Sequence, residues 1–175
     1  YPEYLDALEA TSRVMDIGAQ LSHGALRFFV MGERGADHTE VPTQTELDEL
    51  RRLAQEALAA GALGISTSRT TKHKAADGRL TPSLTAGDPE LAAIAQAMRE
   101  ADAGVLQVNS DFGPGEFEHL RQAAELSGRP LSVLLLQVDN DPELWKVTRD
   151  DIHSANAAGI ADHANGCIFI FTRIT

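Results

Sequence analysis

Cysteine is nearly absent from this chain, since Cys167 is the single cysteine among 175 residues. One cysteine cannot close a disulfide within the chain, which excludes a disulfide-stabilised scaffold and predicts a reducing, cytoplasmic compartment. We expect Cys167 to be a small buried apolar residue. Cysteine and histidine never occur at zinc-finger spacing, and there is no HExxH or HxH pair. The sequence therefore predicts no metal site made from its own residues.

Positive charge is also scarce in this sequence. The chain has 15 Lys and Arg against 26 Asp and Glu, which gives a formal net charge of −11. Nucleic acids and anionic membranes are bound by clusters of Lys and Arg, and here the basic residues are scattered. The longest apolar stretch, at 131–138, is far shorter than the roughly 20 residues that span a bilayer. We therefore expect no nucleic acid and no membrane as partners.

Nucleotide-binding and nucleophile-elbow motifs are missing as well. The segment GERG at 32–35 lacks the Gly-Lys-Ser/Thr ending of a P-loop. Neither GxGxxG nor GxSxG occurs anywhere in the chain. No cofactor or reaction can therefore be assigned from a short motif alone.

What the chain does contain is a repeated order of a helical stretch, a glycine, a short apolar strand and then polar residues. The repeat is clearest at 56–70, 97–113 and 123–141. We expect strands at 14–21, 63–67, 105–108 and 131–138, with one more strand within 167–175. The apolar run at 131–138 suggests a strand that is buried on both faces, as in a parallel sheet.

The expected helices alternate with these strands. They cover 2–10, 25–31, a helix capped by Thr43 or Thr45 and ended by Gly61, 88–103, 116–126 and 142–158. This order predicts an α/β fold, a partial TIM (β/α) barrel of four to five βα units with a parallel sheet. A complete barrel needs about 250 residues. A doubly wound, flavodoxin-like sheet fits the same order of elements.

Polar residues that directly follow the strands are the candidate site residues, because parallel α/β folds place their chemistry at the carboxyl ends of strands. The candidates are His23, Arg27, Ser66, Ser68, Arg69, Asn109, Asp111 and Gln137. Each has a structural alternative. His23 would be a hydrogen-bonded structural residue, the segment 109–111 an Asx turn, and Gln137 a partner for backbone groups. His73, in the long loop at 68–87, would either contact substrate or be exposed to solvent.

Three segments carry a resemblance to a known family. They are YLDALEA at 4–10, SHGALRFFVMGERG at 22–35 and ELRRLAQEALAAGALGISTSR at 49–69. Together they resemble the N-acyl-D-amino-acid deacylases, or D-aminoacylases, of the metal-dependent amidohydrolase superfamily. Members show a YxDAL helix, a GHxxLR segment and an ALxxGAxG[IFL]ST strand, in this order. The resemblance is good over 1–69 and looser through Val138.

The resemblance implies a TIM-like barrel that binds a divalent metal, usually zinc, and hydrolyses an N-acyl amide. In such enzymes the metal polarises the carbonyl and lowers the pKa of a bound water, and a carboxylate moves the proton. His23 and Arg27 match the His and Arg of the GHxxLR segment, and we interpret them as residues that support the site. The implied small-molecule partner is an N-acyl amino acid or a related amide.

The chain also departs from the family pattern. The HxH pair of the first strand would lie before Tyr1, and the catalytic Asp beyond Thr175. Strands that commonly end in THMR and SHHK read VLQVNSD at 105–111 and VLLLQVD at 133–139, so that Asn109 and Gln137 stand where imidazoles are expected. Amide oxygens are poor zinc ligands compared with imidazole. We therefore expect a metal in the family but none on this chain.

These observations favour one function and leave two alternatives open. We expect residues 1–160 to be part of an amidohydrolase-like barrel, a fragment that is inactive alone and acts on linear amide C–N bonds in its parent. Residues 161–175 match nothing in the family, and a truncation or frame change near Ala161 would account for this tail. One alternative is a non-catalytic α/β module that binds a small ligand. The other is a half-barrel that associates with itself or a partner through open strand edges.

Overall fold

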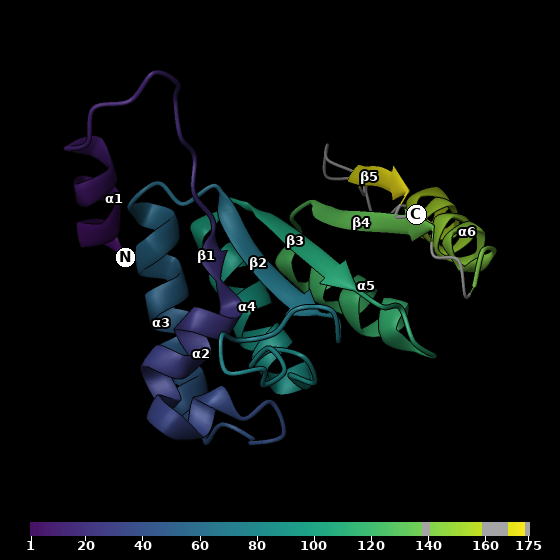
Figure 1. Cartoon of the computed structure of the whole chain (residues 1–175), viewed down its shortest axis with the longest axis horizontal. Helices are drawn as coiled ribbons and strands as arrows, with labels where there is room; N and C mark the ends of the chain where they lie inside the picture. The colour runs from purple at the N-terminus through teal and green to yellow at the C-terminus, as the bar shows by residue number, and fades with distance from the viewer. Residues whose placement is uncertain (138–140, 159–167, 174–175) are drawn as a thin grey trace.

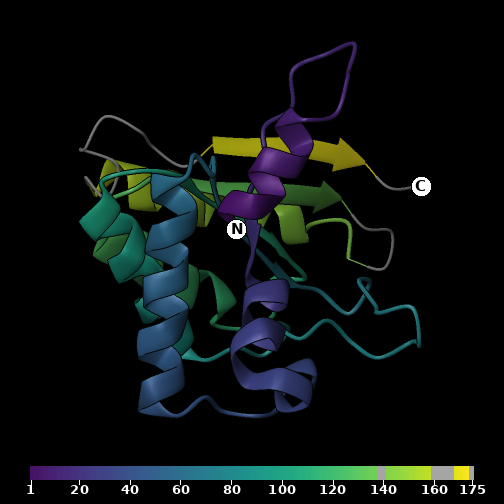
Figure 2. The ribbon, with the colours of Figure 1, turned by 90° about the vertical axis from the view of Figure 1, so that its left-hand side faces the viewer.

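The computed structural model describes residues 1–137 and 141–158, and the backbone of 168–173. Its centre is a sheet of five parallel strands in the order β1-β2-β3-β4-β5. Figure 1 shows the strands side by side in chain order. They are β1 (Leu21–Ser22), β2 (Gly64–Arg69), β3 (Val105–Ser110), β4 (Leu131–Gln137) and β5 (Ile168–Arg173). In Figure 2, β4 and β5 run in the same direction.

One helix precedes the first strand, and the other helices connect successive strands. They are α1 (Pro2–Glu9), α2 (His23–Met31), the 3-10 helix η1 (Gly32–Ala36), α3 (Gln44–Ala59), α4 (Asp88–Ala101), α5 (Glu116–Ser127) and α6 (Leu144–Ala157). Helix α3 packs on α4, and α4 packs on α5. These helices lie on one side of the sheet (Figure 1).

The strand order decides between the two fold classes that the sequence left open. A flavodoxin-like sheet has the order 2-1-3-4-5 and helices on both faces. Here each strand pairs with the next one in the chain, as in the wall of a (β/α) barrel. The expected α/β fold with a partial (β/α) barrel is confirmed.

The two faces of the sheet differ in their burial. On β2, β3 and β4, residues that point toward the helices are buried, and the residues between them are mostly half-buried. Ile65, Val108 and Val133 belong to the main apolar core, together with Ile94 and Met98 of α4. The sequence suggested that β4 is buried on both faces. The strand is buried on its helix side alone, because Ser132 and Leu134, on the other face, are half-buried.

The first predicted strand is much shorter than expected. The structure has β1 at Leu21–Ser22 in place of 14–21. Val14 and Met15 are exposed, and Leu63 N–H donates to the Ala19 carbonyl at 2.9 Å, beyond the end of the β1–β2 pairing. An apolar segment forms a strand only if its backbone N–H and C=O groups can pair with a neighbouring strand. Most of the segment 14–21 has no such partner within the described residues.

Two strands extend further than the sequence indicated. β2 ends at Arg69 in place of Thr67, and β3 ends at Ser110 in place of Val108. As a result, Ser68, Arg69 and Asn109 lie on strands, where backbone pairing fixes their positions. Ser68 pairs with Asn109 in the register between β2 and β3.

Gly64, at the start of β2, is a position that the fold reserves for glycine. Its φ of +152° lies in a region that L side chains rarely adopt, and an added Cβ would lie 2.0 Å from the Val105 carbonyl oxygen. Glycine therefore allows β2 and β3 to approach at their first residues.

The segment Ile168–Arg173 pairs with β4 in parallel, which confirms the strand expected near the end of the chain. Cys167 and residues 161–167 lie outside the described residues, so the expected burial of Cys167 and the separate tail stay predictions. Among the described helices, none combines the length and the apolar character needed to cross a membrane.

Candidate functional site

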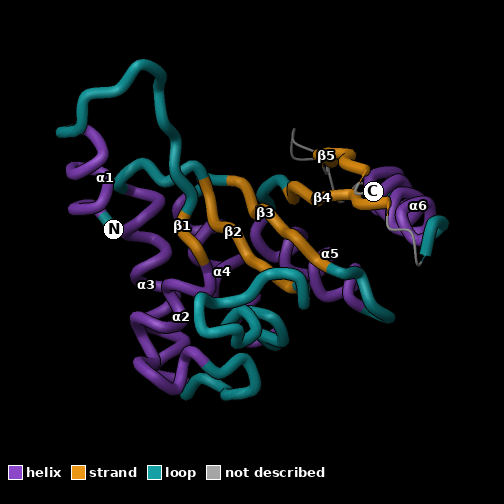
Figure 3. Tube along the Cα trace, in the orientation of Figure 1, coloured by secondary structure: helices purple, strands orange, loops and turns teal. Residues whose placement is uncertain are grey.

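The carboxyl ends of β2, β3 and β4 form the candidate site, which we call the rim. The loop at 70–87 follows β2 and lies beside the ends of β2 and β3 in Figure 3. Paired neighbours at this end are Ser68 with Asn109 and Arg69 with Ser110. The eight residues selected from the sequence fall into two groups, one buried toward the helices and one at the rim.

His23 and Arg27 belong to the buried group. Both side chains are fully buried in the first two turns of α2. His23 Nδ1 lies 3.0 Å from Thr67 Oγ1, and His23 Nε2 lies 3.2 Å from Glu90 Oε2. Arg27 Nη1 donates to the other Glu90 oxygen. The two residues and Glu90 thus join α2, β2 and α4 in one polar cluster beneath the sheet.

Arg27 also holds the segment that follows α2. Its Nε donates to the Gly35 carbonyl at 3.2 Å, and its Nη2 donates to the carbonyls of Asp37, at 3.1 Å, and of Glu40. With its contact to Glu90, the guanidinium is used on all sides. His23 and Arg27 therefore make contacts that hold the fold together. The contacts of His23 agree with the alternative interpretation, in which it is a hydrogen-bonded structural residue.

Glu90 was missed by the sequence reasoning, because it looked like an ordinary acidic residue in the first turn of a helix. It is buried on α4. Burial acts to raise the pKa of its carboxyl, but the hydrogen bond from His23 and the charges of His23 and Arg27 together hold the pKa below 4.5. The signal that could have found it is the need of buried Arg27 for a negative partner.

Arg69 is also buried on the helix side of β2. Its Nε and Nη2 donate to the two carboxylate oxygens of Glu116, the latter at 3.2 Å, and its Nη1 donates to the Ala86 carbonyl at 2.6 Å. This bidentate pair ties the end of β2 to the start of α5. Arg69 lies next to the rim but is directed into the helix layer.

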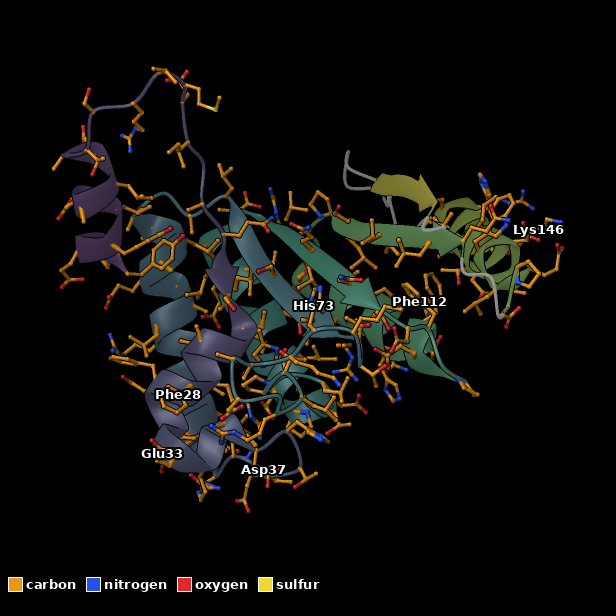
Figure 4. All side chains as sticks on the ribbon, in the orientation of Figure 1. Phe28, Glu33, Asp37, His73, Phe112 and Lys146 are labelled. Carbon is orange, nitrogen blue, oxygen red and sulfur yellow. The ribbon has the colours of Figure 1, made fainter. Side chains whose placement is uncertain are left out.

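Ser68, His73 and Asn109 meet on the open face of the sheet, opposite the helices. Ser68 Oγ lies 2.6 Å from His73 Nδ1, and Asn109 Nδ2 lies 3.2 Å from His73 Nε2. Figure 4 shows His73 beside the ends of these strands. His73 is exposed, as one of the two sequence alternatives had it. The sequence did not indicate that it would bridge Ser68 and Asn109, because the long loop hides the contact. Ser66 is half-buried on β2, two residues before Ser68.

Asp111 fixes the start of the loop that carries His73. Its carboxylate accepts from Thr70 Oγ1 at 2.5 Å, from Thr71 N–H at 2.8 Å and from Thr71 Oγ1 at 2.9 Å. Burial acts to raise the pKa of Asp111, but these hydrogen bonds and the charge of Lys72 lower it. The carboxylate therefore stays ionised at neutral pH.

At 109–111 a serine side chain forms the turn in place of the expected Asn or Asp side chain. Ser110 Oγ accepts from Phe112 N–H at 3.0 Å, which closes the turn after β3. This leaves the Asp111 side chain to bond across to the loop after β2. The turn chemistry was predicted in the right place but at the wrong residue.

A pocket of about 330 Å³ opens beside Asp111, between the ends of β3 and β4 and helix α6. Its wall mixes apolar and polar residues, and the charged residues among them are Lys72, Asp111 and Asp141. The lining residues are Thr71, Lys72, Ser110, Asp111, Phe112, Leu135, Leu136, Asp141, Leu144, Trp145 and Thr148. Gln137 is half-buried at the end of β4, opposite Arg173 of β5 in the strand register.

The donor groups of the rim do not fit a divalent metal centre of the kind that the resemblance implies. Within the part of the chain that the structure describes, no three His, Cys, Asp or Glu side chains are grouped so that they could hold a metal ion. His73 is bonded to a hydroxyl and an amide, and Asp111 to two threonines. Zinc and similar ions prefer imidazole, thiolate and carboxylate ligands in one group.

Comparison with known proteins gives a short, partial similarity. The chain is 40% identical to the D-aminoacylase of Alcaligenes xylosoxydans xylosoxydans over 67 residues, which make up 38% of the chain and 13% of that enzyme. It is 40% identical over 65 residues to uncharacterized proteins of Mycobacterium tuberculosis (strain ATCC 25618 / H37Rv) and Mycobacterium bovis (strain ATCC BAA-935 / AF2122/97). These residues cover 37% of the chain and 11% of each protein. No family model matches the chain, and no solved structure matches it significantly. The similarity supports a distant relationship to D-aminoacylase.

Proposed function

We propose that this chain is part of a hydrolase that acts on linear amide C–N bonds, with N-acyl amino acids as the substrate class. The observation that carries the proposal is the order of the parallel strands, which brings polar residues of β2 and β3 together at one rim. The distant relationship to D-aminoacylase supports the same reaction class. The rim is the face where (β/α) barrels bind their substrates.

The pocket beside Asp111 has the chemistry for such a molecule. Its volume is at the lower end of the roughly 300–1,000 Å³ range of small-molecule sites, as suits a short acyl chain on one amino acid. Leu136, Leu144 and Trp145 offer apolar contact to the acyl chain or side chain. The ammonium of Lys72 would receive the free carboxylate of the substrate.

Binding of N-acyl amino acids without hydrolysis of their amide bond is the expected behaviour of this chain. The described residues provide no grouped metal ligands with which to activate a water for amide hydrolysis. What the residues of the rim would do is bind and orient the substrate, with Asp111 holding the loop in place.

Trp145 makes the proposal testable in solution, because it is the single tryptophan of the chain and lines the pocket. Titration with N-acetyl-D-leucine should change its fluorescence, and free D-leucine should not. Lys72→Met should weaken binding by about tenfold or more, since a hydrogen bond to a charged group contributes about 1.5–3 kcal/mol. Lys74→Met, two residues further along the same exposed loop, is the matched control.

Amide hydrolysis is measured in the same samples, with and without added Zn²⁺. We expect no release of acetate above the background. Unchanged fluorescence at millimolar ligand, or equal weakening by Lys72→Met and Lys74→Met, would contradict substrate binding at this pocket. Zinc-dependent release of acetate would contradict binding without turnover.

A second candidate function, association through the strand edges, is favoured by the sheet itself. Within the described ranges, β1 pairs with β2 alone and β5 with β4 alone. Val14, Met15 and Leu63 are exposed, and Leu63 N–H donates to the Ala19 carbonyl shortly before β1. Unpaired strand edges and exposed apolar residues promote association with another chain. Sedimentation velocity should then show a species that grows with concentration, and a monomer at every concentration would exclude this function.

A further inference from the structure

The contact between Ser68 and His73 is built like a nucleophile beside its base. The Oγ–Nδ1 distance of 2.6 Å is short enough for direct transfer of the hydroxyl proton. Ser68 is half-buried at the end of β2, on the sheet face opposite the helices. The general arrangement of a nucleophilic hydroxyl, an imidazole and a third group that orients the imidazole requires no particular sequence motif.

Both members of this pair are held in place from outside the contact. Ser83 is fully buried. Its hydroxyl donates to the Ser68 carbonyl at 2.8 Å and accepts from Ser68 N–H at 3.3 Å. The loop that brings His73 is fixed by the three hydrogen bonds that Asp111 accepts from Thr70 and Thr71. A site works when such surrounding contacts fix its geometry.

Asn109 supplies the third group. Its Nδ2 faces His73 Nε2, while its Oδ1 is buried and has no hydrogen-bond partner among the residues that the structure describes. If the amide turns by 180°, Oδ1 accepts a hydrogen bond from Nε2–H and Nδ1 keeps its lone pair for the Ser68 hydroxyl. This is the tautomer in which the imidazole acts as a base toward serine.

We propose that Ser68 is a nucleophile that takes acyl groups from activated carboxylic esters, with His73 as its general base. The Ser68 oxygen forms a bond to the carbonyl carbon, and its proton moves to His73 Nδ1. The ester C–O bond breaks, and a phenolate or similar anion leaves without needing a proton. The imidazolium of His73 then gives its proton to solvent. Water attacks the acyl-serine and gives a proton to His73, the bond between the acyl carbon and Ser68 Oγ breaks, and His73 returns that proton to Ser68 Oγ as the carboxylic acid leaves. This inference does not depend on N-acyl amino acid binding at the pocket.

The test uses a fluorophosphonate probe, which reacts with activated serines, and mass spectrometry of the intact chain and its peptides. The serine oxygen bonds to phosphorus, fluoride leaves, and the proton goes to His73. We expect one probe per chain, on Ser68, and no such label in Ser68→Ala. His73→Gln should slow labelling about a hundredfold, the scale of general base catalysis. Ser132→Ala, half-buried on β4, should label like the unmodified chain.

Asn109→Asp separates a catalytic arrangement from a surface hydrogen bond. An aspartate carboxylate can only accept a hydrogen bond, so it holds His73 in the tautomer with a hydrogen on Nε2. The Nδ1 lone pair of His73 is then available to the Ser68 hydroxyl. We therefore expect labelling that is about tenfold faster or more in Asn109→Asp, and slower labelling in Asn109→Leu. Circular dichroism verifies that each variant is folded. The absence of label on Ser68, an unchanged rate in His73→Gln, or equal rates in the two Asn109 variants would overturn the proposal.

Discussion

Replacing Glu90 by glutamine should destabilise the chain more than replacing any exposed carboxylate of the same helix. Glu90 is 2% exposed and bonds to Arg27 and His23, which are both fully buried. In Glu90→Gln the shape is kept, but the positive charge of Arg27 stays buried without a negative partner. Breaking a buried ion pair in this way costs about 3–5 kcal/mol.

The loss is large compared with the free energy of unfolding of ordinary domains, about 5–15 kcal/mol. For a chain of this length it corresponds to a midpoint of thermal unfolding that is roughly 6–20 °C lower. Glu100→Gln is the matched control on α4, because Glu100 bonds to Arg51 at 3.3 Å on the surface. Such exposed pairs contribute about 0–1 kcal/mol. Both variants are compared by urea unfolding at neutral pH.

The destabilisation caused by Glu90→Gln should also depend on pH. The pKa of Glu90 in the folded chain is lowered below 4.5. A lowered pKa contributes stability that is present above the unfolded value and is lost as the pH falls through the folded value. The difference between the unmodified chain and Glu90→Gln should therefore be full at neutral pH and should shrink under acid conditions below pH 4.5. A neutral-pH difference below about 1 kcal/mol would refute the role of this cluster.

Two further variants test the local structure. Gly64→Ala should lower the unfolding free energy by about 3 kcal/mol or more, because its Cβ would lie 2.0 Å from the Val105 carbonyl oxygen. Gly113→Ala, with open space around it, should change it by less than about 0.5 kcal/mol. Equal effects on urea unfolding would contradict the close strand contact. Thr43→Ala removes one half of a capping box with Glu46 and should cost about 1 kcal/mol. Thr45→Ala should change little, and a reversed order in thermal unfolding would show that the cap is assigned wrongly.

The sequence predicted the order of helices and strands because each element carries its own local signal. Helix α3 shows the clearest case, since a Thr43 cap and apolar residues at helical spacing leave one arrangement. The strand at 14–21 failed because its apolar residues need a neighbouring chain segment, and pattern alone does not show whether one is present. The helix expected at 88–103 starts at Asp88 as predicted, with Gly87 as its cap, and ends at Ala101.

The candidate site was predicted less completely, for a physical reason. Position after a strand selects residues near the rim, and Ser68, Asn109 and Asp111 lie there. It cannot tell which face of the strand a side chain takes, so Arg69 was included although it bonds to Glu116 on the helix side. It also cannot follow a loop, so the contact of His73 with Ser68 was not foreseen.

The residues that carry the resemblance to D-aminoacylases contribute to the fold of this chain more than to its rim. The most distinctive of these residues, His23 and Arg27, are buried in contacts with Glu90, Thr67 and backbone carbonyls. These contacts join α2 to β2 and α4, so in this chain the two residues stabilise the fold. The residues that would contact a substrate lie at the rim, where Asn109 occupies a position expected for imidazole. The reaction of this chain is therefore best sought in the hydroxyl, imidazole and amide groups present at the rim. The labelling of Ser68 tests those groups directly.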